Sequence, residues 1–293
     1  MERALSLESP AKINLFLEVL ERRPDGYHEI DTLFQTVSLA DTVEVTAAPG
    51  GSGIEVATDD ASLPRDEENL AGRAARALLV EAGRGDVGVR VRIAKRIPSG
   101  AGLGGGSGDA ATVLVALDRL LALGWGAERL EAIGARIGSD VPFLVRGGTA
   151  RGQGRGERLT RLSPLERVPI LLAKPPISVS TRWAYDNLRT RLTARRPFPK
   201  IAVADASLRV SELEGSVWNA FAEPVASVHP SVGEARDMML GRGALAASLT
   251  GTGPTVFGLF PDESTLGDAE RDLTSRAYWS ARVVPVGERP LGS

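Results

Sequence analysis

The chain has 293 residues, a formal net charge of −2 at pH 7 and 25% charged side chains. This near-neutral balance gives no overall positive field, so we expect no nucleic-acid partner. The absence of cysteine excludes disulfides and thiolate chemistry. With only His28 and His229, a histidine-rich metal site is disfavoured, and we assign no metal-ligating side chain.

The length and the hydropathy pattern favour about two globular domains without a membrane segment. Domains usually hold roughly 100–200 residues. No apolar run approaches the roughly 18 residues that a membrane helix needs, and residues 1–10 lack the apolar core of a signal peptide. We therefore expect a cytoplasmic protein with no membrane partner.

The first third of the chain is predicted to hold short strands and one helix. Strands are expected where apolar and polar side chains alternate, at residues 12–20, 41–46, 53–57 and 87–93. An amphipathic helix is expected over residues 67–80. Pro24, Asp25 and Gly26 indicate a turn. Tyr27 and His28 follow it, and their local sequence favours exposed loop residues.

A glycine-rich stretch follows the strand at 87–93 and precedes a helical pattern from about residue 110. It consists of Pro98, Ser99, Gly100, Ala101, Gly102, Leu103, Gly104, Gly105, Gly106, Ser107 and Gly108. Glycine allows positive φ and close approach of a ligand, and consecutive N–H groups can form an anion nest. The helix N-terminus adds unpaired N–H groups and the positive end of its dipole. We therefore expect this stretch to bind phosphate.

Other readings of the stretch are a loop without a ligand, a Walker A loop and a dinucleotide-binding loop. The first stays open, because glycine-rich loops are common. A Walker A loop requires Lys-Ser/Thr after its glycines, which this chain lacks. Gly100, Gly102 and Gly105 match G-x-G-x-x-G, but that fold needs an acid at the end of a second strand. The nearest candidate, Asp118, lies inside the helical pattern, so we reject this reading.

The rest of the chain mixes helices and strands without strict βαβ order, which favours an α+β fold. Helices are predicted at residues 112–123, 128–137, 181–192, 217–228, 232–240 and 266–277. Strands are predicted at residues 168–173, on both sides of the Gly-Thr-Gly turn within 246–260, and at 281–286. Residues 147–156 form a glycine-rich segment in which the chain is expected to turn back, and residues 195–205 are expected to be irregular. Asp140, two residues before Pro142, is either a helix cap or a functional carboxylate.

Five motifs in order carry a resemblance to a known family. They are Pro10-Ala11-Lys12-Ile13-Asn14-Leu15, Arg23-Pro24-Asp25-Gly26-Tyr27-His28, Gly104-Gly105-Gly106-Ser107, Gly138-Ser139-Asp140-Val141-Pro142 and Leu249-Thr250-Gly251-Thr252-Gly253. Together they resemble the small-molecule kinases grouped as galactokinase, homoserine kinase, mevalonate kinase and phosphomevalonate kinase, the GHMP kinases. One departure is Gly108-Asp109, where the family often has Ser-Asn. This departure leaves open whether the stretch supplies a side-chain ligand for Mg²⁺.

The resemblance implies a two-domain α+β fold with the active site in the cleft between the domains. An N-terminal nucleotide-binding domain is expected at residues 1–162 and a ferredoxin-like domain at residues 163–293. The implied activity is ATP-dependent phosphorylation of an alcohol, with Mg²⁺ as the counter-ion of ATP. The best match is to members that phosphorylate the 2-hydroxyl of a cytidine diphosphate-linked methylerythritol in the non-mevalonate isoprenoid pathway. A homoserine- or mevalonate-type kinase and a catalytically silent ligand-binding homologue are the alternatives.

The resemblance also implies roles for single residues. Asp140 would accept the hydroxyl proton, and Lys12 beside it would keep the carboxylate ionised. The glycine-rich stretch would hold the ATP phosphates, with Lys95 and Asn69 at the nucleoside.

The expected substrate contacts are Asn14, Tyr27, His28, Thr181 and Tyr185. Tyr27 and Tyr185 would stack on the cytosine and His28 would meet its polar edge, because aromatic faces and edge hydrogen bonds are the usual means of reading a free base. Trp183 is the alternative to Tyr185. The sequence gives no oligomeric state.

Overall fold

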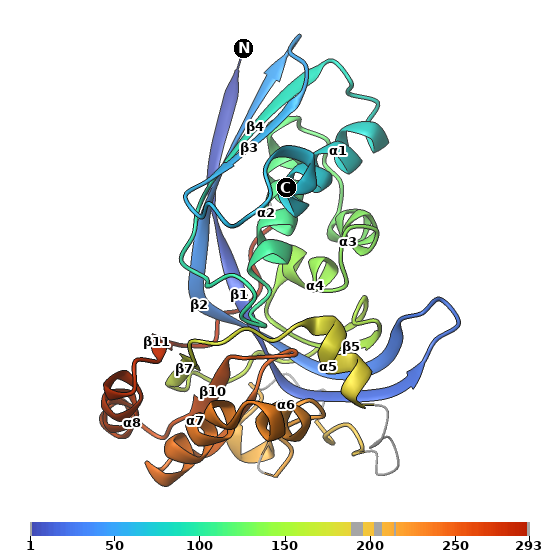
Figure 1. Cartoon of the computed structure of the whole chain (residues 1–293). Helices are drawn as coiled ribbons and strands as arrows, with labels where there is room; N and C mark the ends of the chain where they lie inside the picture. Colours follow the sequence, from blue (N-terminus) through green and yellow to red (C-terminus); the bar gives the residue numbers. More distant parts are fainter. Residues whose placement is uncertain (1, 189–195, 202–206, 214, 292–293) are drawn as a thin grey trace.

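The computed structural model describes residues 2–188, 196–201, 207–213 and 215–291. A seven-stranded sheet contains β1 (Arg3–Arg22), β2 (His28–Pro49), β3 (Ile54–Thr58), β4 (Val87–Ala94), β5 (Thr149–Gly154), β6 (Arg158–Arg161) and β8 (Trp218–Asn219). A four-stranded antiparallel sheet has the order β11 (Trp279–Val283), β7 (Ile170–Lys174), β10 (Val256–Leu259), β9 (Ala246–Leu249). In Figure 1 the four-stranded sheet lies in the lower half of the view, and the seven-stranded sheet fills the upper half and extends into the lower half through β1, β2 and β5.

Four helices pack beside the first sheet: α1 (Leu70–Glu81), α2 (Gly105–Leu120), α3 (Ala127–Ala135) and α4 (Val141–Arg146). Asn69 caps α1, because its side chain accepts a hydrogen bond from the N–H of Ala71 at 3.0 Å. Every residue of α2 from Gly108 to Asp118 is buried, as its nearly all-apolar sequence predicts. This helix lies at the centre of the upper core, and its N-terminus is directed towards the lower half (Figure 1).

The lower half adds α5 (Thr181–Asn187), α6 (Ala222–Val228), α7 (Pro230–Gly241) and α8 (Glu263–Ser275). A second buried cluster joins α6, α7 and α8 to β9 and β10. Short 3₁₀ turns occupy Asp66–Glu68 and Val210–Leu213.

The paired strands β1 and β2 form one long ribbon that runs through both halves (Figure 1). Its lower part accepts β8, which pairs in parallel through Phe16 and Trp218. The chain after β11 also returns to this ribbon, because the N–H of Val286 donates to the carbonyl of Thr36 at 3.0 Å. The ribbon thus carries sequence-distant segments to a common place.

Several predicted elements differ from those in the structure. The strands predicted at 12–20 and 41–46 are parts of the longer β1 and β2. The helix after the glycine-rich stretch begins at Gly105, so the last glycines form its first turn. The helix predicted at 217–228 is wrong for its first residues, which form β8, and the glycine-rich segment at 147–156 contains β5. The predicted helix 181–192 is confirmed at its start, where α5 begins at Thr181. Its last residues, 189–192, and residues 195 and 202–205 of the predicted irregular segment lie outside the described residues.

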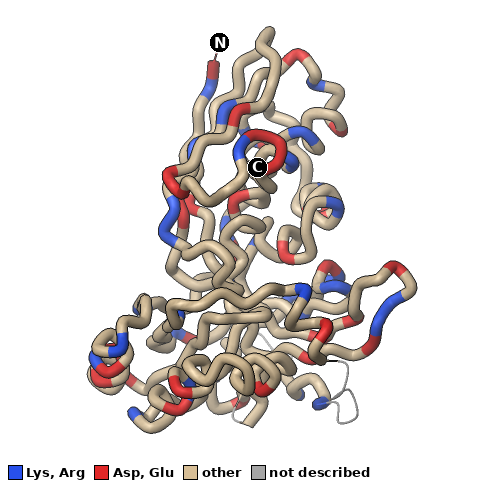
Figure 2. The backbone as a smooth tube through the Cα atoms, viewed as in Figure 1, with Lys and Arg blue, Asp and Glu red and all other residues tan. Residues whose placement is uncertain are grey.

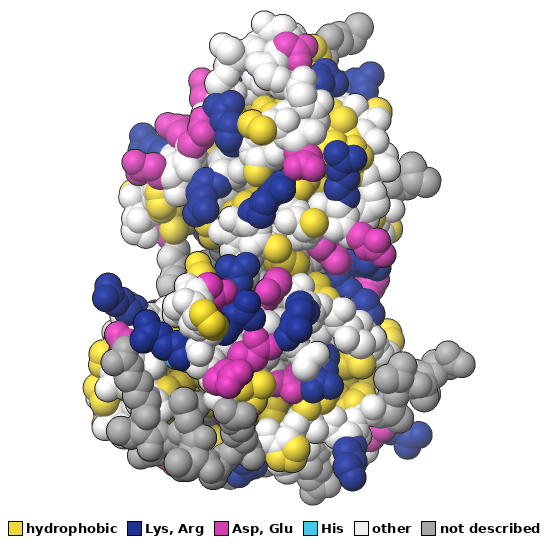
Figure 3. All heavy atoms as spheres, turned by 90° about the vertical axis from the view of Figure 1, so that its right-hand side faces the viewer, with side chains coloured by type: hydrophobic (Ala, Val, Ile, Leu, Met, Phe, Trp, Pro, Cys, Tyr) yellow, Lys and Arg dark blue, Asp and Glu magenta, His cyan; other side chains and the backbone are white. Residues whose placement is uncertain are grey.

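Charge is mixed over the whole molecule. Basic and acidic positions are interspersed in both halves (Figure 2), and the face in Figure 3 carries both signs beside apolar side chains. Within the described ranges, we find no helix with the length and apolar character needed to cross a membrane.

Candidate active site

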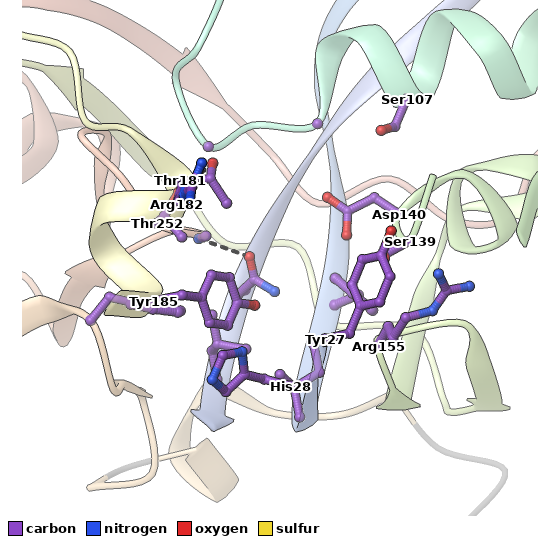
Figure 4. A pocket seen from close by; sticks show the side chains of 18 of the residues that line it. Tyr27, His28, Ser107, Ser139, Asp140, Arg155, Thr181, Arg182, Tyr185 and Thr252 are labelled. Carbon is purple, nitrogen blue, oxygen red and sulfur yellow. Dashed lines mark hydrogen bonds between the residues drawn. The ribbon is translucent and has the colours of Figure 1, made fainter. Parts of the chain in front are cut away.

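A cavity of about 690 Å³ lies where the β1–β2 ribbon, the glycine-rich stretch, the start of α4 and the start of α5 meet (Figure 4). The predicted site residues in its lining are Lys12, Asn14, Tyr27, His28, Gly102, Gly104, Ser107, Asp140, Thr181 and Tyr185. Those outside the lining are Asn69, Lys95, Pro98, Ser99, Gly100, Ala101, Leu103, Gly105, Gly106 and Gly108. The structure therefore brings together the predicted catalytic and substrate residues, with three residues of the glycine-rich stretch.

The glycine-rich stretch forms a close backbone wall at one end of this cavity. Gly102 and Gly104 have φ of 77° and 73°, a region that disfavours other residues. A Cβ on Gly102 would lie 2.4 Å from the carbonyl oxygen of Thr250, and one on Gly104 would lie 2.9 Å from Lys12 Cγ. The N–H of Lys12 donates to the carbonyl of Leu103 at 2.9 Å, which fixes the stretch against β1. The first turn of α2 therefore presents its N–H groups and dipole beside the cavity, as a phosphate site requires.

The residues flanking this stretch have structural partners. The ammonium of Lys95 bonds to the buried carboxylates of Asp41 and Asp109, and lies 2.7 Å from Asp109 Oδ2. Asp41 also accepts from the N–H of Ile97 at 2.8 Å. Asn69 uses its carbonyl for the α1 cap and donates from its amide to Pro64 O at 2.9 Å. The geometry thus gives Lys95 and Asn69 roles in holding the stretch and α1, and their expected nucleoside contacts stay predictions.

Lys12 and Asp140, 128 positions apart, form an ion pair in the cavity. Lys12 Nζ lies 3.3 Å from Asp140 Oδ2, with 4% of the Lys12 side chain and 30% of the Asp140 side chain exposed. Asp140 stands at the N-cap position of α4 but makes no capping hydrogen bond from its side chain. The helix-cap interpretation of this carboxylate is therefore wrong. One of its oxygens meets the ammonium of Lys12, and the carboxylate points into the cavity (Figure 4).

Asn14 ties this ion pair to the lower half of the molecule. Its Oδ1 accepts from Lys12 Nζ at 2.8 Å and from the N–H of Gly251 at 2.9 Å. Its amide donates to Thr32 Oγ1 at 2.8 Å, which fixes the orientation of the side chain. The turn at 250–253 is thereby held against β1, and it places Thr252 Oγ1 3.3 Å from Thr181 Oγ1.

Aromatic side chains line the opposite end of the cavity. Tyr27 faces Tyr185 across the space, and His28 stacks on Tyr185 with centroids 4.8 Å apart (Figure 4). Tyr185 also meets Phe221 edge to face at 4.8 Å. Burial, with a smaller contribution from the charge of Asp140, raises the pKa of Tyr185 to about 12, so its hydroxyl stays neutral. Trp183 is absent from the lining and contacts His229 instead, so the geometry selects Tyr185 over Trp183.

Sequence reasoning missed several lining residues, among them Arg155, Arg182, Ser139 and Thr252. Ser139 and Thr252 lie within motifs that were recognised, so their neighbours gave a signal. Nothing local distinguishes Arg155 from the many other arginines of this chain. Its position depends on the pairing of β5 with β2, which the sequence did not predict.

Two family models match the chain: GHMP kinases N terminal domain over residues 69–148 and GHMP kinases C terminal over residues 207–278. The 4-diphosphocytidyl-2-C-methyl-D-erythritol kinase of Synechococcus sp. (strain JA-3-3Ab) is 40% identical over 97% of this chain and 96% of its own. The enzyme of that name from Geobacter sp. (strain M21) is 41% identical over 96% of this chain and 99% of its own.

Solved structures agree with these relatives. A crystal structure of 4-(cytidine 5'-diphospho)-2C-methyl-D-erythritol kinase matches with a TM-score of 0.74 and 35% identity, covering 97% of this chain and 100% of that chain. A homoserine kinase from Cytophaga hutchinsonii has the same TM-score at 20% identity, covering 97% and 95%, and so shows the fold alone. These matches confirm the predicted α+β fold, with a GHMP kinase N-terminal domain and a GHMP kinase C-terminal domain. The chain belongs to the GHMP kinase family of ATP-dependent small-molecule kinases, and within it to the 4-diphosphocytidyl-2-C-methyl-D-erythritol kinases.

Proposed function

We propose that the chain transfers the γ-phosphoryl group of ATP to the 2-hydroxyl of 4-diphosphocytidyl-2-C-methyl-D-erythritol. The observation that carries the proposal is the Lys12–Asp140 pair, which lies in one cavity between a glycine-rich helix N-terminus and an aromatic end. The names of the full-length relatives support the choice of substrate. A homoserine- or mevalonate-type kinase would have no evident use for the aromatic end.

The chain's own residues supply positioning and charge. Asp140 accepts the proton of the substrate hydroxyl as its oxygen forms a bond to the γ-phosphorus and the bond to the β–γ bridging oxygen of ATP breaks. Lys12, whose ammonium lies 3.3 Å from the Asp140 carboxylate, orients that carboxylate and offsets negative charge on the transferred group. ADP leaves with the bridging oxygen, and the proton remains on Asp140 until solvent removes it.

The ATP phosphates would bind beside Gly102, Gly104 and the first turn of α2, which line the cavity through Gly102, Gly104 and Ser107. Side chains at both glycines would collide with neighbouring protein atoms, so only glycine lets the stretch pack this closely against Thr250 and Lys12 beside the cavity. Mg²⁺ would accompany ATP and neutralise phosphate charge. The described residues contain no group of three acidic, histidine or cysteine side chains able to hold a metal. We expect the phosphate oxygens of ATP to bind Mg²⁺, and we assign no side chain of the chain as its ligand.

At the other end, Tyr27 and Tyr185 would stack on the two faces of the cytosine while His28 meets its polar edge. Asn14 and Thr181, both in the lining, would contact the sugar-alcohol part. The division into domains at residues 1–162 and 163–293 and a cytoplasmic location also stay proposals.

The test is release of ADP from Mg²⁺-ATP in the presence of the cytidyl substrate, homoserine or mevalonate. We expect turnover with the cytidyl substrate and only background release with the other two alcohols. Turnover with another alcohol alone would identify a sister kinase. Binding of ATP and the cytidyl compound without ADP release would identify a catalytically silent homologue.

A further inference from the structure

Arg155 lies in the tight turn that joins β5 to β6, next to the loop that carries Tyr27. The pairing of Gly154 with Ile30 fixes the register of this turn against β2. The turn closes when the N–H of Gly156 donates to the carbonyl of Gln153 at 3.0 Å. Strand register therefore places Arg155 beside a residue that lies 128 positions earlier in the sequence.

The guanidinium of Arg155 stacks on the Tyr27 ring, with its Cζ 4.7 Å from the ring centroid. Two groups hold the guanidinium from its edges. Nη2 donates to the carbonyl of Ala135 at 3.1 Å, and Nε lies 3.8 Å from Glu157 Oε1. A planar cation held by its edges presents a face, and stacking on an aromatic ring uses that face.

Tyr27 needs such support because 53% of it is exposed. The backbone N–H of Tyr27 donates to Asp25 Oδ1 at 3.1 Å, which fixes the loop but not the ring. In Figure 4 the Tyr27 ring lies between Arg155 and the side of the cavity that carries Tyr185 and His28. The ring thus contacts the guanidinium while Tyr27 lines the cavity.

We propose that Arg155 is a positioning residue for the cytosine subsite, which holds the Tyr27 ring ready to stack on the base. This inference rests on the proposed function, because it assumes a cytidine-containing substrate. A ring fixed in advance loses less conformational freedom when the base binds, so affinity for the base rises without a direct contact from Arg155.

The test separates this role from a direct contact of Arg155 with the substrate's phosphates. Calorimetry would give dissociation constants for uncharged cytidine, for CDP and for ATP. The proteins are wild type, Arg155→Met, Tyr27→Ala and the double variant. The matched control is Arg129→Met, because Arg129 stacks on Trp125 with Cζ 3.7 Å from the ring and neither residue lines the cavity.

We expect Arg155→Met to raise the dissociation constants for cytidine and for CDP by the same factor, about two- to fivefold. This factor corresponds to the energy of an exposed cation–π contact. The dissociation constant for ATP should stay unchanged, which also shows that the variant is folded. The effect on cytidine should disappear in the Tyr27→Ala background, since the residue through which Arg155 acts is then absent. Arg129→Met should match wild type for all three ligands.

Three outcomes would overturn the inference while the proposed function stands. In the first, Arg155→Met binds cytidine as tightly as wild type. In the second, Arg155→Met loses affinity for CDP but not for cytidine. In the third, Arg155→Met lowers cytidine affinity even in the Tyr27→Ala background. A wild-type protein that binds neither cytidine nor CDP would instead overturn the proposed function, and the inference with it.

Discussion

At the scale of single residues, the function proposed here depends most on Asp140. Its side chain caps no helix and meets Lys12 at 3.3 Å. Asp140→Asn should lower kcat by about 10²-fold or more, because the amide cannot accept the hydroxyl proton. Steady-state ADP release measures the loss, and an unchanged unfolding midpoint shows that the fold is intact. Asp186→Asn makes the same change to another carboxylate of the lining and should keep kcat within a few-fold. Equal losses in both variants would contradict the assignment of the base.

A second residue, Asp109, gives the molecule a pH-dependent stability. Burial, partly opposed by Lys95 and reinforced by Asp41, raises the pKa of Asp109 from 3.8 to about 6. Its Oδ1 has no hydrogen-bond partner among the described residues. Between these pH values the folded state binds a proton that the unfolded state releases. Burial of the ionised Asp109 carboxylate therefore lowers the free energy of unfolding fully above pH 6 and has no effect on it below pH 4.

Asp109→Asn removes this titration while Lys95 keeps Asp41 as its partner. The free energy of unfolding of wild type, relative to Asp109→Asn, should fall by on the order of 2–3 kcal/mol as pH rises from 4 to 6, at 1.36 kcal/mol per pKa unit. Urea unfolding of both proteins across this range measures the difference. A difference that stays constant with pH would show that Asp109 titrates normally.

At the scale of elements, periodicity predicted most helices and strands but not their ends or partners. The buried helix after the glycine-rich stretch was predicted from its apolar sequence, yet its start at Gly105 was not, since glycine has low helix propensity. Packing of the first turn of α2 against β1 and Ile97 overrides that propensity. In the same way, β8 was predicted as helix because only its pairing with β1 makes it a strand.

The close wall formed by the glycine-rich stretch can be tested with a matched pair of glycines. Gly100 and Gly102 both have positive φ, 64° and 77°, so alanine strains the backbone at either position by about 1–2 kcal/mol. A Cβ at Gly100 would meet nothing within 4 Å, whereas one at Gly102 would lie 2.4 Å from the oxygen of Thr250. Gly102→Ala should therefore lose more stability than Gly100→Ala, and should also raise the KM for ATP several-fold. Chemical unfolding and ADP-release kinetics measure both effects, and equal behaviour of the two variants would show that the close contact is unimportant.

At the scale of the whole molecule, the motifs predicted which residues matter, but only the fold shows how they meet. Asn14 and the turn at Gly251 are 237 positions apart, and no local pattern indicates their hydrogen bond. Two asparagines hold this turn from different strands. Asn14 accepts from the N–H of Gly251, while the amide of Asn219 donates to the carbonyls of Leu249 at 2.8 Å and Gly251 at 2.9 Å. The junction between the halves is therefore also the support of the site.

This junction gives a prediction that separates stability from catalysis. Asn14→Ala and Asn219→Ala each leave buried polar groups of the turn without a partner, so each should lower the free energy of unfolding by about 1–3 kcal/mol. Asn14 also accepts from Lys12 Nζ at 2.8 Å, whereas the hydrogen bonds of Asn219 do not involve Lys12. Asn14→Ala should therefore reduce kcat further than Asn219→Ala does, because it releases the lysine that faces Asp140. Unfolding curves and ADP-release rates of the two variants measure both quantities, and a kcat loss of the same size in each would mean that the turn, not Lys12, carries the effect.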